Sequence, residues 1–315
     1  MMGLKMDESL ILNFRLDVPF LYKYCGPTGV DILSSLRLKV TPPDQFNDPF
    51  EFTPKSNCNF TRDSIKDLPF DRTSVLRMWE EMPVEKRGQI DFDKFYSAFQ
   101  NELAGGLKCV PQDHKDRIVK QFHHEANRIA MRAPSFLGEH FGVVCLSEVP
   151  DDILMWSHYT SKHQGFVLGF DVQQPFIKTG PNLVPVEYSS ERALVDISAK
   201  GANEDPRTYI PILRRKSLHW AYEREWRLIC LLKFCVPWKD PQDKDQYYCP
   251  IDPMAISRVV FGKRCSDETK SQVEQAIAKN GLGHVQRFTA DIHESDFRLT
   301  ISPVEQTPLD NKSTQ

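Results

Sequence analysis

The sequence predicts an α+β protein built on a mixed or antiparallel sheet, with a helical insert. Short β-type runs recur from FLYKY at residues 20–24 to FRLTIS at 297–302, and their spacing is too irregular for a repeated βαβ pattern. No GxGxxG or GxxxxGK[ST] motif occurs, so the phosphate-binding turns of the common nucleotide-binding folds are not predicted. Helical spacing is concentrated in one polar stretch, residues 61–134.

The N-terminal elements alternate between regular and irregular structure. FLYKY is expected to form a strand, and the Gly/Pro turn at residues 26–29 starts a short amphipathic helix. The next segment, KVTPPDQFNDPFEF, contains three prolines. Because proline lacks an N–H and pushes the preceding residue toward extended geometry, this segment is expected to be an irregular loop.

The rest of the chain divides into an insert and a series of strands. Residues 61–134 are polar and are expected to form the helical insert. Strands are expected at 143–147, 165–171, 183–189, 225–232, 258–262, 284–288 and 297–302, and helices at 206–218 and 267–279. These elements predict an N-terminal extension over residues 1–18, a single α+β domain over 19–305 and a disordered tail over 306–315.

Composition excludes several classes of protein. The 40 Lys and Arg nearly balance the 43 Asp and Glu, so no global field favours nucleic acid or a membrane surface. No stretch approaches the ~20 apolar residues of a spanning helix, and MMGLKMDESL lacks the apolar core of a signal peptide. The protein is therefore expected in the cytoplasm, without a membrane partner. Its oligomeric state is left open.

Cysteine and histidine spacing does not predict a metal site. The eight cysteines include no CxxC pair, and several fall inside apolar runs, which favours free buried thiols. His123 and His124 are adjacent, but no HExxH pattern accompanies them, so no metal is expected. No GxSxG motif supports a serine nucleophile.

Two aromatic segments are candidate ligand contacts. In the first strand, alternation places Tyr22 and Tyr24 on one face and Lys23 on the other, where the lysine is able to pair with an anion or remain solvated. In LMWSHY, Trp156, His158 and Tyr159 are suited to hold a flat heterocycle, although a cluster of this kind also forms simple core.

A third segment, KSLHWAYEREWRL at residues 216–228, supplies the candidate catalytic carboxylate. If the strand begins near Glu223, its period of two places Glu223, Glu225 and Arg227 on one face. A buried carboxylate is paired or functional. Glu225 is therefore either a catalytic group or a member of an ion-pair ladder.

These segments, in this order, resemble a bacterial family of unknown function, number 2971 among such domain families. The shared motifs are LYKY, FNDPFE, CLSE, LMWSHY followed by GFVLGFD, and KSLHWAYEREWRL. Their order is also similar to that of DNA-targeting ADP-ribosyltransferase toxins. On that similarity Lys23 takes the first motif position, residues 154–156 the second, and Glu225 the position of the catalytic glutamate.

The resemblance implies a fold like that of ADP-ribosyltransferases and NAD as the substrate. Glu225 would stabilise the cationic transition state of glycosidic cleavage. The nicotinamide would stack on Tyr24, Trp156 and Tyr159, beside His158. Lys23 or Arg227 would hold an anionic portion of NAD.

Two functions remain open at this point. The first is an ADP-ribosyltransferase-like enzyme that modifies a nucleic-acid or protein acceptor, in anti-phage defence or toxin–antitoxin conflict as the resemblance implies. The second is a catalytically inactive module that uses the same cleft to sense a nucleotide or a partner. Convergence of Lys23, Trp156, His158 and Glu225 on one pocket would favour the enzyme.

Overall fold

The computed structural model describes residues 16–56, 61–64, 72–105, 112–178, 182–195, 209–240, 242 and 244–304. The chain divides into two compact units, one of residues 1–53, 133–193 and 203–315, the other of residues 54–132 and 194–202. Most of the expected N-terminal extension, and all of the expected tail, lie outside the described residues. The single-domain organisation remains a prediction.

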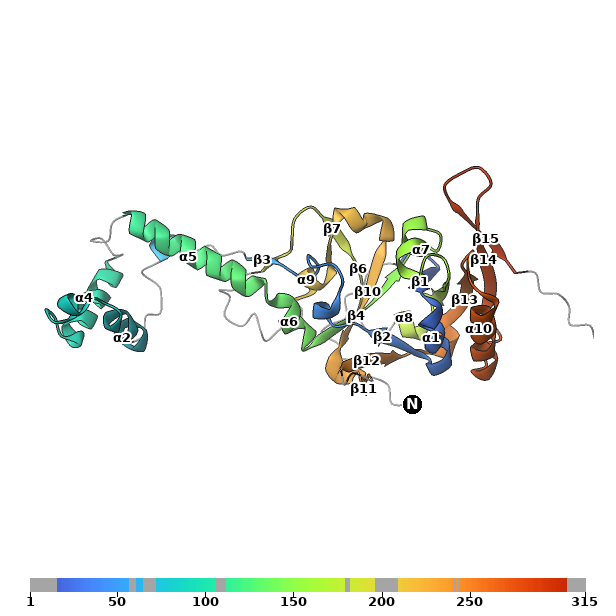
Figure 1. Cartoon of the computed structure of the whole chain (residues 1–315), viewed down its shortest axis with the longest axis horizontal. Helices are drawn as coiled ribbons and strands as arrows, with labels where there is room; N and C mark the ends of the chain where they lie inside the picture. The colour runs from blue at the N-terminus through green and yellow to red at the C-terminus, as the bar shows by residue number, and fades with distance from the viewer. Residues whose placement is uncertain are drawn as a thin grey trace, which may run out of the picture. The chain divides into compact units, whose positions relative to one another are not determined.

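The first unit is built on an eight-stranded sheet of order β15-β14-β13-β5-β1-β4-β10-β6 (Figure 1). In chain order its strands are β1 (Phe20–Cys25), β4 (Phe141–Ser147), β5 (Phe166–Asp171), β6 (Asn182–Pro185), β10 (Glu225–Leu231), β13 (Ile256–Phe261), β14 (Gln286–Ile292) and β15 (Leu299–Pro303). Among the pairs of this sheet that the structure describes, only β13 and β14 run parallel. The expected α+β class with a mixed, largely antiparallel sheet is confirmed.

The four strands that carry the sequence motifs are consecutive in this sheet, in the order β5-β1-β4-β10. β1 pairs with β5 along its whole length, and β10 pairs with β4 from Glu225↔Ser147 to Leu231↔Phe141. Of these, β4 and β5 are apolar and buried on both faces along most of their length, which is typical of strands at the centre of a covered sheet. The motifs are thus brought together by strand pairing.

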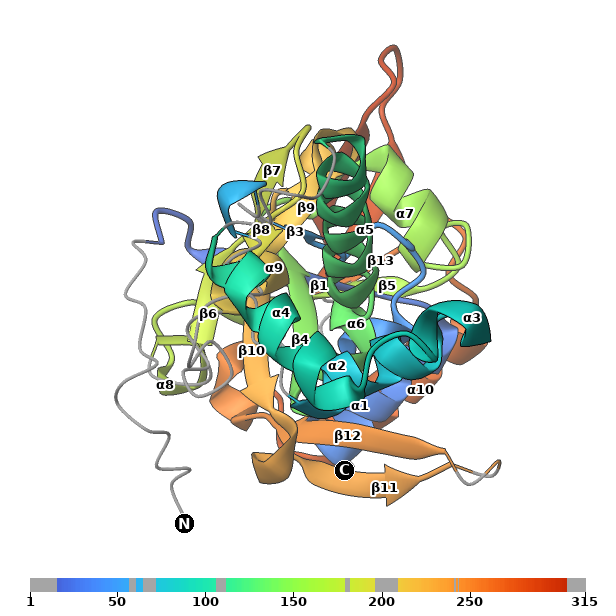
Figure 2. The ribbon, with the colours of Figure 1, turned by 90° about the vertical axis from the view of Figure 1, so that its left-hand side faces the viewer.

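Helices cover both faces of the sheet. One face packs on α1 (Val30–Ser35) and α10 (Asp267–Lys279), which contact each other (Figure 2). On the opposite face, Met155 and Trp156 of α7 (Ile153–Tyr159) pack on Tyr22 and Tyr24. The α7 helix begins where the Asp152 carboxylate accepts hydrogen bonds from two backbone amides.

Smaller elements complete the first unit. A three-stranded sheet of order β11-β12-β2 joins β2 (Arg37–Val40), β11 (Val236–Lys239) and β12 (Asp245–Pro250), and β7 (Glu187–Ser189) pairs with β9 (Arg215–Ser217). Short helices are α6 (Ala133–Gly138), α8 (Pro175–Lys178), α9 (Ile210–Arg214) and the 3₁₀ helices η2 (Pro27–Gly29), η3 (Pro43–Gln45), η6 (Leu218–Glu223), η7 (Leu232–Phe234) and η8 (Pro253–Ala255). The helix expected over 206–218 is wrong in part, because residues 215–217 form a strand.

The second unit is mainly helical. It contains α2 (Arg72–Glu80), α3 (Val84–Arg87), α4 (Phe92–Ala104) and α5 (Gln112–Ala130), with a two-stranded pair of β3 (Lys55–Ser56) and β8 (Leu194–Val195). Asp91 caps α4 by accepting a hydrogen bond from the backbone amide of Lys94. Within the described part of the chain, no helix is long and apolar enough to cross a membrane.

Candidate functional site

The candidate site lies where two central strands separate. β4 pairs with β10 over seven residues, but it pairs with β1 only at Tyr22↔Ser147. Past this point, Lys23 Nζ donates a hydrogen bond of 3.1 Å to the Cys145 carbonyl, and Thr41 forms an isolated bridge with Val143. In a continuous sheet the backbone of β1 would bond to these β4 residues. Here the Lys23 side chain and the loop residue Thr41 form those hydrogen bonds instead, and β1 and β4 separate.

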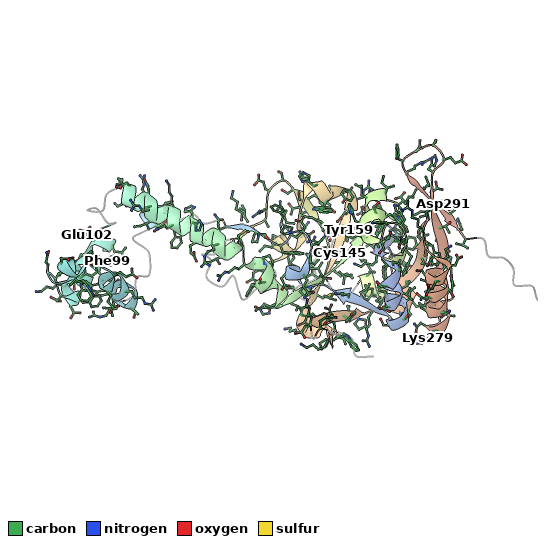
Figure 3. All side chains as sticks on the ribbon, in the orientation of Figure 1. Phe99, Glu102, Cys145, Tyr159, Lys279 and Asp291 are labelled. Carbon is green, nitrogen blue, oxygen red and sulfur yellow. The ribbon has the colours of Figure 1, made fainter. Side chains whose placement is uncertain are left out.

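A cavity of about 280 Å³ occupies this region. Figure 3 marks Cys145 and Tyr159, which contribute to its wall from β4 and α7. The wall combines tyrosines, amides and charged side chains: Tyr22, Lys23, Tyr24, Thr41, Gln45, Phe46, Asn47, Glu51, Val143, Cys145, Leu146, Ser147, Met155, Tyr159, Lys216, Glu223 and Glu225. A concave site with a few convergent polar groups is the usual form of a small-molecule site.

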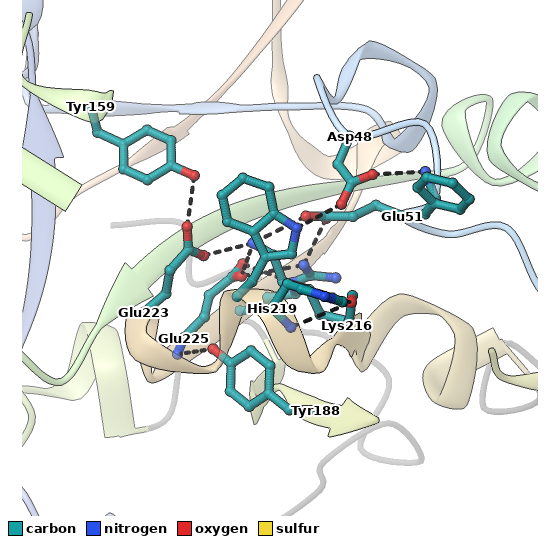
Figure 4. A network of polar contacts seen from close by, with 12 residues as sticks. Asp48, Glu51, Tyr159, Tyr188, Lys216, His219, Glu223 and Glu225 are labelled. Atoms are coloured by element: carbon teal, nitrogen blue, oxygen red, sulfur yellow. Dashed lines mark hydrogen bonds and ion pairs between the residues drawn. The ribbon is translucent and has the colours of Figure 1, made fainter. Parts of the chain in front are cut away.

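Lys216 lines the cavity and is the centre of a buried ion network (Figure 4). Its Nζ lies 2.6 Å from Glu223, 2.8 Å from Glu225 and 3.0 Å from Glu51, and its side chain is 5% exposed. β9 holds this lysine in place, because Lys216 pairs with Tyr188 of β7. The Tyr188 hydroxyl in turn accepts a hydrogen bond from the backbone amide of Glu225.

Arg227 forms the second cationic centre of the network. Its guanidinium donates to Glu225 from Nε and to Glu51 from an Nη, both at 2.8 Å, and to the Leu213 carbonyl at 2.7 Å. The centroid of the Phe52 ring lies 4.8 Å from the guanidinium carbon of Arg227, so the ring packs against this side chain. Phe52 adopts a φ of 56°, uncommon for a bulky residue. The FNDPFE loop is thus fixed on the network through Glu51 and Phe52.

Glu223 and Glu225, which stand two residues apart, have pKa values shifted in opposite directions. Burial alone would raise the pKa of Glu225, but Arg227 and Lys216 lower it well below its ordinary value. Burial raises the pKa of Glu223, and Lys216 offsets only part of that rise. The network contains three carboxylates and two cations. Glu51 and Glu225 contact both cations, whereas Glu223 contacts only Lys216, so the negative charge of Glu223 is the least stabilised of the three. The Tyr159 hydroxyl donates a 2.7 Å hydrogen bond to the same carboxylate.

The structure brings four of the predicted site residues to one cavity: Lys23, Tyr24, Tyr159 and Glu225. Lys23 is half-buried and makes no ion pair with any described residue. Tyr24 donates to the Val149 carbonyl at 2.9 Å, so its ring is fixed against the cavity. Tyr159 is half-buried but its hydroxyl is already bonded, as described above.

The other three predicted residues do not line the cavity, so of the four residues whose convergence would favour the enzyme only Lys23 and Glu225 meet there. Trp156 is fully buried, and its indole donates to the Pro150 carbonyl, so it supports the Tyr24 ring at a centroid distance of 5.7 Å rather than contacting a ligand. His158 is exposed on α7. Arg227 is fully buried with its donors occupied. A direct ligand contact is therefore not available to Trp156 or Arg227 in this arrangement.

Several network residues were absent from the predicted site. Glu51, Glu223 and Lys216 line the cavity, and the Trp220 indole donates to the Asp48 carboxylate at 2.8 Å, which anchors the loop. The sequence offered an indication of two of these residues, because Glu51 ends the FNDPFE motif and Glu223 stands two residues before Glu225. Strand alternation alone did not rank them above other charged residues.

Other chemistries find less support in the described residues. Ser147 is buried, and its hydroxyl donates to the Glu223 carbonyl at 2.7 Å, so it acts as a structural contact. Burial raises the pKa of the Cys145 thiol, which disfavours the thiolate. Across the described ranges, no group of three or more His, Cys, Asp or Glu side chains is arranged to hold a metal ion.

Comparison with protein families finds a match over part of the chain. Residues 155–228 match the model of a family described as protein of unknown function (DUF2971). The chain resembles that family. The matched stretch runs from α7 to the middle of β10 and includes Lys216, Glu223 and Glu225, whereas LYKY and FNDPFE lie before it. No curated protein and no solved structure matches the chain.

Proposed function

We propose that the protein is an ADP-ribosyltransferase-like enzyme that uses NAD as a substrate and modifies a macromolecular acceptor. The observation that carries this proposal is that Glu223 and Glu225 line one cavity together with Tyr24 and Tyr159. The pKa values of the two carboxyl groups are shifted in opposite directions, which suits them to different roles in one reaction.

The ionised member of the pair supports charge stabilisation. Glycosidic cleavage of NAD leaves a cationic, oxocarbenium-like sugar, and the departing nicotinamide takes the bonding electron pair. A negative charge fixed beside that sugar lowers the barrier because it interacts more strongly with the transition state than with the ground state. Glu225 stays ionised through Lys216 and Arg227, and the net negative charge of the network acts in the same direction.

The second member supports proton transfer. The acceptor's nucleophilic atom bonds to the sugar carbon and loses a proton, which a nearby base takes up. Glu223 lines the cavity, and its partners are one lysine and the Tyr159 hydroxyl, 2.7 Å away. Its raised pKa brings the carboxyl closer to the working pH, which is the condition for efficient general acid–base exchange.

The aromatic wall supports binding of a flat heterocycle. Tyr24 and Tyr159 line the same cavity as the carboxylates, and the buried Trp156 holds the Tyr24 ring edge-on at 74°. Rigid aromatic rings offer a large contact area at little cost in side-chain entropy. Lys23, without an ion-pair partner among the described residues, is the cation available to an anionic portion of NAD.

One observation favours the second candidate, a nucleotide-binding module without catalysis. Glu225 is 4% exposed, and Arg227 contacts both of its oxygens, at 2.8 and 3.3 Å. A carboxylate locked in this way serves the fold. In that case the cavity would bind the same ligand, and the network would only maintain its shape.

The deciding experiment incubates purified protein with labelled NAD and cell extract. Wild type is compared with Glu223→Gln, Glu225→Gln and the control Glu191→Gln, an exposed glutamate outside the cavity, at matched folded concentrations. Loss of label transfer by about a hundredfold in Glu223→Gln, with the melting temperature retained, is expected. Equal labelling in all variants, or none in wild type with varied acceptors, would favour the binding module.

A further inference from the structure

A second cationic position lies on the α7-covered face of the sheet, outside the cavity. Arg258 of β13 stands in a row with Gly169 of β5 and Tyr22 of β1, because Gly169 pairs with both. Tyr22 is also part of the cavity wall. The row therefore connects the cavity to a neighbouring patch of the same sheet face.

An irregularity in β13 places the Arg258 side chain on the sheet face that α7 covers. The register of β13 against β5 shifts between Ile256 and Arg258. Both Ile256 and Val259 are fully buried in the core on the opposite face, whereas Val260 packs with Tyr22. Without the irregularity, Ile256 and Arg258 would share a face, since side chains alternate along a regular strand. The irregularity thus turns the arginine away from the α1/α10 core.

Aromatic rings fix the guanidinium in position. Its carbon lies 3.8 Å from the centroid of Phe20 and 5.3 Å from that of Phe288. Gly169 leaves room for this arrangement, because a Cβ there would lie 3.1 Å from both the Arg258 Cβ and the Tyr22 ring. Holding the side chain between two rings reduces the conformational entropy that a ligand would have to remove.

The charge of Arg258 is not balanced locally. No described carboxylate forms an ion pair with it, and its Nε is buried without a hydrogen-bond partner. Asp151, whose charge also acts on Tyr22, makes no ion pair with the guanidinium. Burial raises the pKa of the Tyr22 hydroxyl, and the Arg258 charge opposes that rise. The guanidinium forms a side-chain hydrogen bond with Tyr22, but a neutral phenol does not balance its charge, so the arginine keeps the capacity to pair with an anionic ligand group.

We propose that Arg258 is an anion subsite that binds a phosphate group of the nucleotide whose nicotinamide end occupies the cavity. The subsite rests on the proposed function for its ligand. A guanidinium presents a planar set of donors that matches phosphate oxygens. Tyr22, between the two positions, would lie along the ribose and phosphate part of the ligand.

Binding titrations test the subsite directly. NAD and nicotinamide riboside, which has no phosphate, are titrated into wild type, Arg258→Gln and Arg258→Lys. Arg287→Gln is the control, because Arg287 is the neighbouring strand's arginine and pairs with Glu274. Arg258→Gln is expected to weaken NAD binding by roughly tenfold to a hundredfold, the range of a charged hydrogen bond. Arg258→Lys should weaken it less, and riboside binding should not change.

The outcomes separate the subsite from the proposed function. If wild type binds NAD and neither Arg258 variant weakens it, the subsite is overturned while the proposed function stands. An equal loss for NAD and riboside would also overturn it, because the arginine would then only support the fold. If wild type binds neither ligand, both proposals are wrong. Arg258→Lys retains the cation between the two rings and so guards against simple unfolding of Arg258→Gln.

Discussion

Replacing Lys216 with methionine tests whether the ion network stabilises the first unit. The substitution removes the cation that three carboxylates share within 3.0 Å, and leaves Arg227 alone to balance them. Removing one partner of a buried ion pair costs about 3–5 kcal/mol. For a domain of this size each kcal/mol lowers the melting temperature by roughly 2–4 °C. The melting temperature of Lys216→Met should therefore fall by about 10 °C.

Thermal melts at pH 7 provide the measurement, with Lys263→Met as the control. Lys263 pairs with Asp291, but both side chains are about half exposed, so its loss should cost below about 1 kcal/mol. Although burial would lower the pKa of Lys216, the charges of Glu225, Glu51 and Glu223 raise it. Its contribution is thus complete below the ordinary lysine pKa of 10.5 and is lost only as the pH rises beyond that value. Equal shifts in the two variants would refute a stabilising network.

Three further predictions concern other positions. Because the folded-state pKa of Glu223 is raised, the stability of wild type relative to Glu223→Gln should decrease as the pH rises above 4.5 in urea titrations; a constant difference would contradict the shift. Burial raises the pKa of Cys25 to about 12, so native protein should resist alkylation there at neutral pH, whereas labelling as fast as in urea would count against burial. Gly165→Ala places a Cβ 1.9 Å from the Cys25 carbonyl oxygen and should lower the unfolding free energy by about 3 kcal/mol. Gly283→Ala serves as the control, because no atom lies within 4 Å of a Cβ at position 283. Similar unfolding midpoints for the two variants would show that the backbone near Gly165 shifts at little cost and would contradict the prediction.

The sequence predicted the strands better than the helices between them. Apolar runs identify β4, β5 and β10 because central strands are buried on both faces. Residues 215–217 were expected to be helical, yet they pair with β7, some thirty residues earlier in the chain. The helical propensity of residues 215–217 gives no information about a pairing with β7, so tertiary contacts override local propensity at these residues.

The candidate site was predicted in part. Strand alternation correctly placed Glu225 and Arg227 on one face, where they form an ion pair. Their burial depends on Phe52 and Glu51 from a loop distant in the sequence, which spacing does not reveal. Trp156 was expected beside a ligand, but its indole bonds to the Pro150 carbonyl inside the core. Aromatic spacing on a helix identifies the buried face without distinguishing a core from a binding wall.

Release of nicotinamide from NAD by the purified protein is the most direct test of the account. The proposed function requires that the cavity binds NAD and that its carboxylates promote glycosidic cleavage. Wild type should release nicotinamide above the rate in buffer, and Glu223→Gln should lower that rate by about a hundredfold while it remains folded. A wild-type rate equal to that of buffer, with NAD bound or not and with acceptors added, would contradict the claim.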